Sequence, residues 1–358
     1  MDDYPTSTEC RALRVVAMGG GTGLSAVLHG LKQYVTPAGE EPLPGGLPSI
    51  ADLSAIVTVS DDGGSSGRLR KELNVPAPGD VRNCIVALSE DEALLSRLFQ
   101  YRFPAGEGLG GHNFGNLFLS AMTAITGDFS QAVKHSSAIL ATRGHIYPAT
   151  TSNAQLYAIM DDGSIVRGET NITASQRRIV ELHMEPEDAE PLPLALEAIE
   201  NADVITIGPG SLFTSLAPNL LVRGVANAIA NSRAVKVFVC NLMTQANESL
   251  GLTASDHIRA LCEHARHRFF DYALVNRTPA SADMVLKYAE KQQSQVEADV
   301  DHIEALGVKP ILGEYLLEEL DPREGLIARH DTHQLAHDLL RLMMEQHEAP
   351  VAAFRPEP

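Results

Sequence analysis

Residues 60–70, SDDGGSSGRLR, place two adjacent carboxylates, Asp61 and Asp62, directly after an apolar run and ahead of several glycines and serines. Carboxylate oxygens are hard ligands for Mg²⁺, and they also bind protons. Residues as small as these let a backbone approach a bound group closely. The stretch is therefore a candidate binding loop. The structural alternative is that Asp61 caps a helix and Asp62 is a solvated turn residue.

Asp80 is a third acidic candidate, because it ends a second breaker-rich stretch, VPAPGD at 75–80. It can join Asp61 and Asp62 if its loop folds back to the same edge of the molecule. Asp80 is also a good N-cap residue, and we expect a helix to begin after it, at Val81.

A glycine-rich stretch, GGGTG at 19–23, follows the first apolar run and precedes a helical pattern. It fits the loose G-x-G-x-x-G/A fingerprint of phosphate-binding turns, so Gly20, Gly21, Thr22 and Gly23 are candidate ligand-binding residues. The acid expected about 20 residues further on is missing from a strand end. The alternative is a tight turn between strand and helix.

Other candidate ligand-binding residues are polar or small side chains in predicted loops and at helix starts. His112, Asn113 and Asn116 in GGHNFGN suit a phosphate, a ribose or a base edge, although Asn113 can instead cap the following helix. The remaining candidates are Asn83, Asn153, Gly210, Ser211, Asn241 and Thr244.

Apolar strands alternate with helical patterns along most of the chain. We expect strands at 13–18, 53–59, 203–207, 235–240 and 272–275, and helices near 24–34, 92–101, 114–125, 129–140, 195–201, 220–231, 255–266 and 332–346. This alternation predicts an α/β fold with a doubly wound, mostly parallel sheet. Ligands of such sheets bind outside the carboxyl ends of the strands, so the loops after the first four strands should form one site.

Residues 13–346 are expected to form a single large domain with a small β-hairpin insertion at about 150–184. The hairpin is indicated by strands at 155–160 and 164–167 around an Asp-Gly turn, with a further strand at 178–183. We expect residues 1–12 to be a disordered terminus, 36–49 to be a Pro/Gly-rich loop and 347–358 to be a frayed tail.

The composition is that of an acidic globular protein, with a formal charge of −18 over 358 residues. Such a charge disfavours a nucleic-acid partner, because phosphate backbones require Lys and Arg. No apolar run reaches the ~20 residues of a membrane span, so membrane insertion is not expected. The four cysteines form no C-x-x-C pair, which predicts free thiols and a cytoplasmic location.

Several of these stretches together resemble the gluconeogenesis factor family, a branch of the superfamily that includes the 2-phospholactate transferase of deazaflavin-cofactor synthesis. They are VVAMGGGTGLSAVLHGLK, AIVTVSDDGGSSGRLR, PAPGDVRNCIVAL, GHNFGNLFLSAM, ATTSNAQLYAIMDDG, GPGSLFTSLAPNLL, VCNLMTQANES and ARHDTHQLA. The resemblance extends over about 14–342 and includes most of the predicted strand-end loops.

The resemblance implies a Rossmann-like fold and a homodimer. Transferase members bind a guanine nucleotide-linked phospholactate with Mg²⁺, held by an acid after the second strand and an acid in a proline-containing loop. The matching residues here are Asp62 (or Asp61) and Asp80. The gluconeogenesis-factor branch is instead associated with binding UDP-sugars, and with cell shape and envelope synthesis during gluconeogenic growth.

Two functions follow as hypotheses. The loop PAPGD has one acid fewer than the transferase-like P-D-L-D, which favours a regulator that binds a UDP-sugar or another nucleoside diphosphate. The alternative is a Mg²⁺-dependent, phospholactate-type transferase in which Asp62 and Asp80 are catalytic and act on a nucleoside-diphosphate-linked donor. An NAD-dependent dehydrogenase is a third hypothesis, in which Asp61 contacts a ribose, but it lacks a clear catalytic His/acid pair.

Overall fold

The computed structural model describes residues 12–36, 47–90, 94–104, 106, 108–175, 177–322 and 324–348. Nearly all of the predicted disordered terminus 1–12, the centre of the loop 36–49 and most of the tail 347–358 lie outside the described residues.

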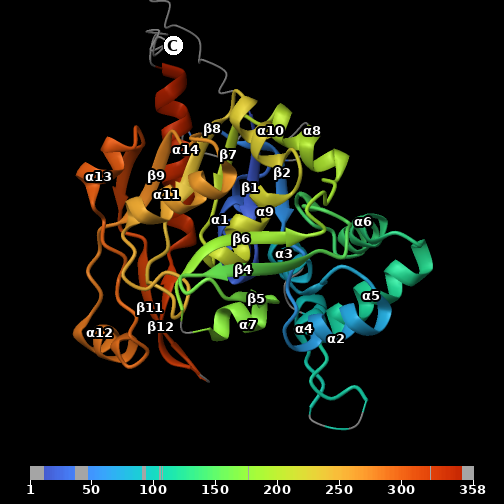
Figure 1. Cartoon of the computed structure of the whole chain (residues 1–358). Helices are drawn as coiled ribbons and strands as arrows, with labels where there is room; N and C mark the ends of the chain where they lie inside the picture. Colours follow the sequence, from blue (N-terminus) through green and yellow to red (C-terminus); the bar gives the residue numbers. More distant parts are fainter. Residues whose placement is uncertain are drawn as a thin grey trace, which may run out of the picture.

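A seven-stranded sheet forms the centre of the molecule (Figure 1). Its strands, in spatial order, are β10 (Lys309–Gly313), β9 (Tyr272–Asn276), β8 (Val235–Val239), β7 (Val204–Ile207), β1 (Leu13–Gly19), β2 (Ile50–Val57) and β3 (His145–Pro148). Every neighbouring pair is parallel. The predicted α/β fold with a doubly wound parallel sheet is therefore confirmed.

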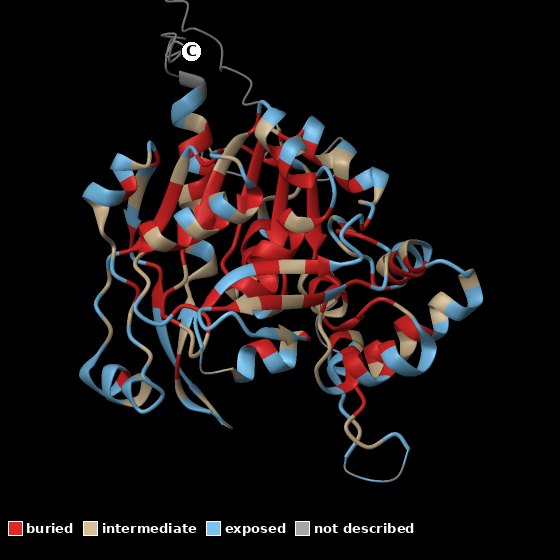
Figure 2. Cartoon of the chain, in the orientation of Figure 1, coloured by how far each residue is buried: buried red, intermediate tan, exposed pale blue. Residues whose placement is uncertain are grey.

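Helices cover both faces of this sheet, and its inner strands are buried almost throughout, whereas the edge strand β10 is only partly buried (Figure 2). One face packs against α1 (Gly21–Leu31), α3 (Gly79–Leu88), α6 (Phe129–Ile139) and α14 (Thr332–Glu348). The other packs against α8 (Pro193–Asn201), α9 (Ala217–Leu221), α10 (Val225–Asn231), α11 (Ala254–Ala265) and α13 (Val300–Ala305). Burial on both faces explains why the strands read as continuous apolar runs.

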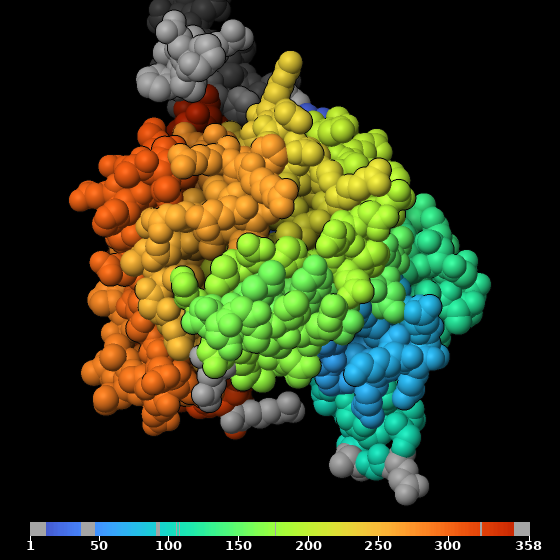
Figure 3. Space-filling model, in the orientation of Figure 1, coloured from blue at the N-terminus to red at the C-terminus, as the bar shows by residue number. Residues whose placement is uncertain are grey.

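Two small antiparallel sheets are added to this core. The predicted hairpin insertion is the three-stranded sheet β5-β4-β6, formed by β4 (Gln155–Met160), β5 (Ile165–Arg167) and β6 (Ile179–Glu185), with α7 (Glu169–Ala174) between β5 and β6. Figure 3 shows this green segment lying against the blue segment that follows β2. The second sheet pairs β11 (Leu316–Asp321) with β12 (Gly325–His330).

Most of the remaining helices lie outside the central sheet and the helices that cover it (Figure 1). They are the 3₁₀-helix η1 (Lys32–Tyr34), α2 (Gly64–Leu73), α4 (Leu94–Gln100), α5 (Phe114–Thr126), the π-helical turn η2 (Leu212–Leu216) and α12 (Ala282–Ala289). Two predictions need correction. Most of 60–70 is the helix α2 rather than a loop, and the single helix predicted at 220–231 is two helices that break at Gly224, whose φ is +83°.

The described part of the chain contains no helix long and apolar enough to cross a membrane. Three described cysteines, Cys84, Cys240 and Cys262, are free thiols.

Candidate functional site

The carboxyl ends of β8, β7, β1 and β2 lie side by side, as predicted, because these strands are consecutive neighbours in the sheet. From β1 the chain proceeds to β2 on one side, and it later returns to β1's other side as β7. The topological switch point therefore lies between β1 and β7, the usual place for a ligand in a doubly wound sheet.

A cavity of ≈ 220 Å³ opens beside this edge, between the loop after β2, the first turns of α2 and α3, and the start of α5. Its lining combines acids, arginines, amides and glycines. The lining residues are Asp61, Gly63, Gly64, Ser65, Ser66, Gly79, Asp80, Arg82, Asn83, Arg102 and Asn116.

Two helices begin at the wall of this cavity without a side-chain cap. Helix α2 follows Gly63 and α3 follows Pro78, and neither helix start receives a side-chain hydrogen bond. The first N–H groups of a helix have no partner within the helix, and the helix dipole adds a positive partial charge there. Two such ends at one cavity favour an anionic group.

Close packing at two glycines brings these helix starts together. A Cβ at Gly67 would lie 1.8 Å from the carbonyl oxygen of Asp62, and a Cβ at Gly79 would lie 2.4 Å from Ser66 Oγ. Any larger residue would separate α2 from the acidic loop or from α3. This requirement gives a structural reason for the small residues in SDDGGSSG.

Asp80 lies in the first turn of α3, which begins at Gly79, so it does not have the predicted N-cap position. Its carboxylate instead accepts the N–H of Gly21 at the start of α1, and a Cβ at Gly20 would lie 2.7 Å from its Oδ2. Burial raises the pKa of Asp80 to about 7, and the negative charge of Asp61 adds to this effect. Asp80 therefore exchanges a proton near neutral pH.

The two adjacent acids Asp61 and Asp62 face different surroundings. Asp61 lines the cavity, and its Oδ1 accepts the N–H of Gly63 at 2.8 Å. Asp62 Oδ1 accepts both the N–H and the Oγ1 hydroxyl of Thr170, at 2.8 and 2.6 Å, and so fixes α7 to the loop. Of the two, Asp61 is the acid that shares the cavity with Asp80.

Two arginines, Arg82 and Arg102, bring positive charge to the cavity, and neither was predicted from the sequence. Burial lowers the pKa of Arg82 to about 10, and the nearby charge of Arg102 lowers it further. Arg82 Nη2 donates to Asn83 Oδ1 at 2.6 Å, while its buried Nε has no partner among the described residues. The one indication in the sequence that Arg82 could belong to the site was its position two residues after Asp80.

The GGHNFGN segment lies against the start of α2. Ser65 Oγ lies 3.1 Å from His112 Nδ1 and accepts the N–H of Asn113, whose side chain caps α5. Asn116 Nδ2 donates to Ser66 Oγ at 3.3 Å, and its buried Oδ1 finds no partner in the described ranges. Asn116 therefore lines the cavity and keeps one buried acceptor without a partner, whereas His112 and Asn113 position α2.

The other predicted residues make contacts within the protein. Gly23 lets α1 lie close to the loop after β7, because a Cβ at Gly23 would lie 2.2 Å from the carbonyl oxygen of Pro209. Thr22 is exposed. Asn153 Oδ1 accepts a hydrogen bond from the buried Arg70.

The loops after β7 and β8 bind each other. Asn241 Oδ1 accepts the N–H of Gly210 at 2.9 Å, and Asn241 Nδ2 donates to the Gly210 carbonyl at 2.8 Å. Thr244 Oγ1 accepts the N–H of Ser294. Ser211 is half-buried, and its carbonyl oxygen accepts N–H groups of η2.

Glu169, at the start of α7, adds a further acid that was not predicted from the sequence. Burial raises its pKa well above the usual range, and the charges of Asp61 and Asp80 contribute to this increase. No group of three or more His, Cys, Asp or Glu side chains with the spacing of a metal site occurs among the described residues.

The fold and the position of the cavity define a Rossmann-like α/β protein with its candidate site at the switch-point edge of the sheet. Residues 15–316 match the family described as 2-phospho-L-lactate transferase CofD. The chain is 46% identical over 326 residues to the gluconeogenesis factor of Halalkalibacterium halodurans, covering 91% of this chain and 95% of that protein. It is 43% identical over 332 residues to the gluconeogenesis factor of Bacillus subtilis, covering 93% and 98%.

A solved structure agrees with these relationships. A crystal structure of a member of the UPF0052 family from Bacillus halodurans has a TM-score of 0.83 at 45% identity, and the match covers 92% of this chain and 99% of that one. The chain therefore belongs to the gluconeogenesis factor family, within the CofD group, as the resemblance predicted.

Proposed function

We propose that this chain is a regulator that binds a nucleoside-diphosphate-linked sugar, of the UDP-sugar type, at the cavity beside α2 and α3. Its place in the gluconeogenesis factor family supports a role during growth on gluconeogenic carbon sources. Roles in cell shape and envelope synthesis, and a homodimeric state, are part of the same proposal.

The observation that carries the proposal is the convergence of anion-binding groups on one cavity. The uncapped starts of α2 and α3 offer backbone N–H groups, and Arg82 and Arg102 line the same space. An incompletely paired, largely buried guanidinium binds a phosphate with charge-assisted hydrogen bonds. A diphosphate has enough oxygens to use both helix ends and both arginines.

A divalent cation fits the acidic side of this cavity. Asp61 and Asp80 bring hard carboxylate oxygens to this space, and Asn116, which also lines it, has a buried Oδ1 without a partner. A bound cation would favour the ionised form of Asp80, whose pKa is about 7, and would offset the charge of the diphosphate. We therefore assign Asp61 and Asp80 as the candidate Mg²⁺ ligands, in preference to Asp62.

Calorimetric titration with UDP-N-acetylglucosamine, with and without Mg²⁺, tests this proposal. The matched variants are Asp61→Asn and Asp62→Asn, which make the same change at adjacent positions. We expect Asp61→Asn to remove the Mg²⁺-dependent part of the affinity, about tenfold or ~1.4 kcal/mol, and Asp62→Asn to retain it.

Two outcomes would count against the proposal. Equal effects of Asp61→Asn and Asp62→Asn on the affinity would mean that Asp61 has no specific role in binding the ligand. Failure to bind any UDP-sugar, together with binding of GDP or NAD, would place the chain in a different functional branch.

A Mg²⁺-dependent transferase is the second candidate, favoured by the proximity of Asp61 to the buried Asp80 and by the CofD family match. In that case the arginines would hold the diphosphate and the acids would hold the cation that stabilises the leaving nucleoside monophosphate. Asp80→Asn should then abolish release of nucleoside monophosphate from a linked donor while donor binding persists. Lack of turnover by the wild type across a panel of acceptor alcohols would reject this candidate.

A further inference from the structure

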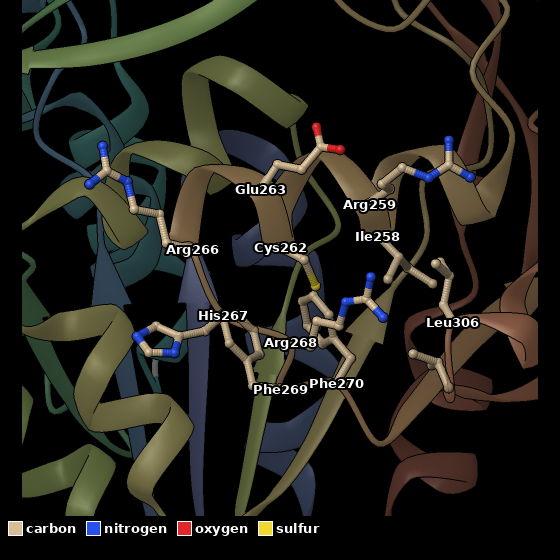
Figure 4. A pocket seen from close by; sticks show the side chains of 11 residues that line it. Ile258, Arg259, Cys262, Glu263, Arg266, His267, Arg268, Phe269, Phe270 and Leu306 are labelled. Atoms are coloured by element: carbon tan, nitrogen blue, oxygen red, sulfur yellow. The ribbon is translucent and has the colours of Figure 1, made fainter.

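A second cavity, of ≈ 310 Å³, lies at the opposite edge of the sheet, where the strands begin (Figure 4). It is enclosed by the C-terminal half of α11, the 266–271 segment that leads into β9, and residues 306–308 after α13. This volume is within the range of about 300–1,000 Å³ that is typical of small-molecule sites. None of its lining residues belongs to the candidate site at the carboxyl edge.

The floor of this cavity is apolar. Ile258, Phe269, Phe270 and Val308 line it and are themselves mostly buried in the core. The rings of Phe269 and Phe270 have centroids 4.7 Å apart and meet at 56°. Two tilted rings and branched aliphatic side chains form a surface that suits an aromatic or branched aliphatic body.

The rim of the cavity carries positive charge, in contrast to the strong negative charge of the whole chain. Arg266, His267 and Arg268 follow one another along it. Arg259 is neutralised by Asp256, at 2.7 Å, but the guanidinium groups of Arg266 and Arg268 have no hydrogen-bond or ion-pair partner within the described ranges. Figure 4 shows Arg268 extending beneath Cys262 toward Phe270, whereas Glu263 extends away from the apolar floor.

We propose that this cavity binds a small organic acid, with a carboxylate on Arg268 and an aromatic or branched aliphatic body on the phenylalanine floor. An unpaired guanidinium such as that of Arg268 matches one carboxylate in a two-point contact. The nearby Glu263 carboxylate disfavours ligands with more than one negative charge. The site is independent of the nucleotide proposal, because the two cavities share no residue.

Cys262 provides a direct reporter of this site. Its thiol is half-buried in the cavity wall, and burial raises its pKa although the charge of Arg268 opposes this. A ligand on the floor would cover the sulfur and slow its alkylation. Cys84 and Cys240 are buried in the core, so they serve as unreactive internal references.

The test is N-ethylmaleimide labelling of the full chain, followed by mass spectrometry of the peptide that contains Cys262. Phenylacetate is the probe. Phenylacetamide is its uncharged analogue, and acetate has the carboxylate but no aromatic ring. At about ten times its dissociation constant, phenylacetate should slow labelling of Cys262 by about tenfold. Neither control compound should slow it comparably.

Two variants sharpen the test. Arg268→Gln should abolish protection by phenylacetate, while the matched surface change Arg341→Gln, on α14, should retain it. Equal protection by acid and amide, retained protection in Arg268→Gln, or no protection of the wild type would each overturn the proposal. The comparison of acid with amide in the wild type holds even if Arg268→Gln folds poorly.

Discussion

Two neighbouring parts of the same sheet edge differ in how their polar groups are used. The β2 half, defined here as residues 61–67, 79–83 and 116, contains uncapped helix starts, an unpartnered amide oxygen and a buried acid with a raised pKa. The β7/β8 half, residues 208–216 and 241–249, has the same small and polar composition. Its groups mainly bind each other, as in the reciprocal pair of Asn241 and Gly210.

Glu248 shows the same contrast between the halves. It is a buried acid of the β7/β8 half, and burial raises its pKa, as for Asp80. Its oxygens, however, accept the N–H of Phe213 and the hydroxyl of Thr214. The β7/β8 half has an unpartnered amide oxygen of its own, the buried Oε1 of Gln245. The two halves therefore differ most clearly in how their buried acids are paired.

The largest expected effect is on stability, in Asp80→Asn. Asp80 has a pKa of about 7 in the folded chain, against about 3.9 for a free aspartate, so the unfolded chain releases its proton first as pH rises. Stability therefore falls between these two values in the wild type, whereas Asn cannot ionise and can still accept the Gly21 N–H. The variant should be more stable by up to about 4 kcal/mol at pH 8.

Urea unfolding at pH 5.5 and pH 8 measures this effect. The advantage of Asp80→Asn should grow by about 2 kcal/mol between the two pH values, because the folded wild type ionises only near pH 7. A constant difference across this range would show that the pKa of Asp80 is not raised.

The next largest effect is expected on ligand affinity, in Arg82→Gln. Removing a guanidinium that is paired with a desolvated phosphate should weaken UDP-sugar binding by about 3 kcal/mol, or ~100-fold. Calorimetry measures this loss. Arg143→Gln, which removes an exposed pair with Glu90, is the matched control and should leave affinity unchanged. Unchanged affinity in Arg82→Gln would place the phosphates elsewhere.

Asn241→Ala tests the β7/β8 half. It leaves both the N–H and the carbonyl of Gly210 without their partner, so unfolding should become about 2 kcal/mol easier. Affinity for the UDP-sugar should change less than twofold. A large loss of affinity at unchanged stability would remove the distinction between the two halves.

Asp62→Asn is expected to give the smallest effect. The amide oxygen can still accept from Thr170, but the hydrogen bonds lose their charge, so stability should fall by about 1 kcal/mol. Thermal unfolding detects this change. A variant that is more stable than the wild type at pH 8, as expected for Asp80→Asn, would mean that Asp62 shares the environment of the cavity.

Much of the fold was predictable because burial on both faces leaves long apolar runs in the sequence, as in β1, β2 and β7. Helix α2 was missed because GGSSG has poor helix propensity, and tertiary packing of α2 overrides that preference. Strands β3 and β10 were not predicted, because β3 is short and β10 contains Pro310. Proline is tolerated there because β10 is an edge strand.

The site was predictable only in part. Strand-end loops identify the correct edge, and Asp61, Asp80, Asn83 and Asn116 do line the cavity. The sequence could not separate Asp61 from Asp62, because Thr170, the partner of Asp62, is 108 residues away in the chain. Arg102 reaches the cavity from a segment that carries no motif.

Hydrogen exchange with and without UDP-N-acetylglucosamine and Mg²⁺ reports on both halves of the edge in one measurement. We expect slower exchange in peptides covering 60–73 and 79–88, whose first N–H groups would hold the diphosphate, and little change in peptides covering 208–216 and 241–249. Protection confined to the second pair of peptides would instead place the ligand at the β7/β8 half and rule out the cavity beside α2 and α3.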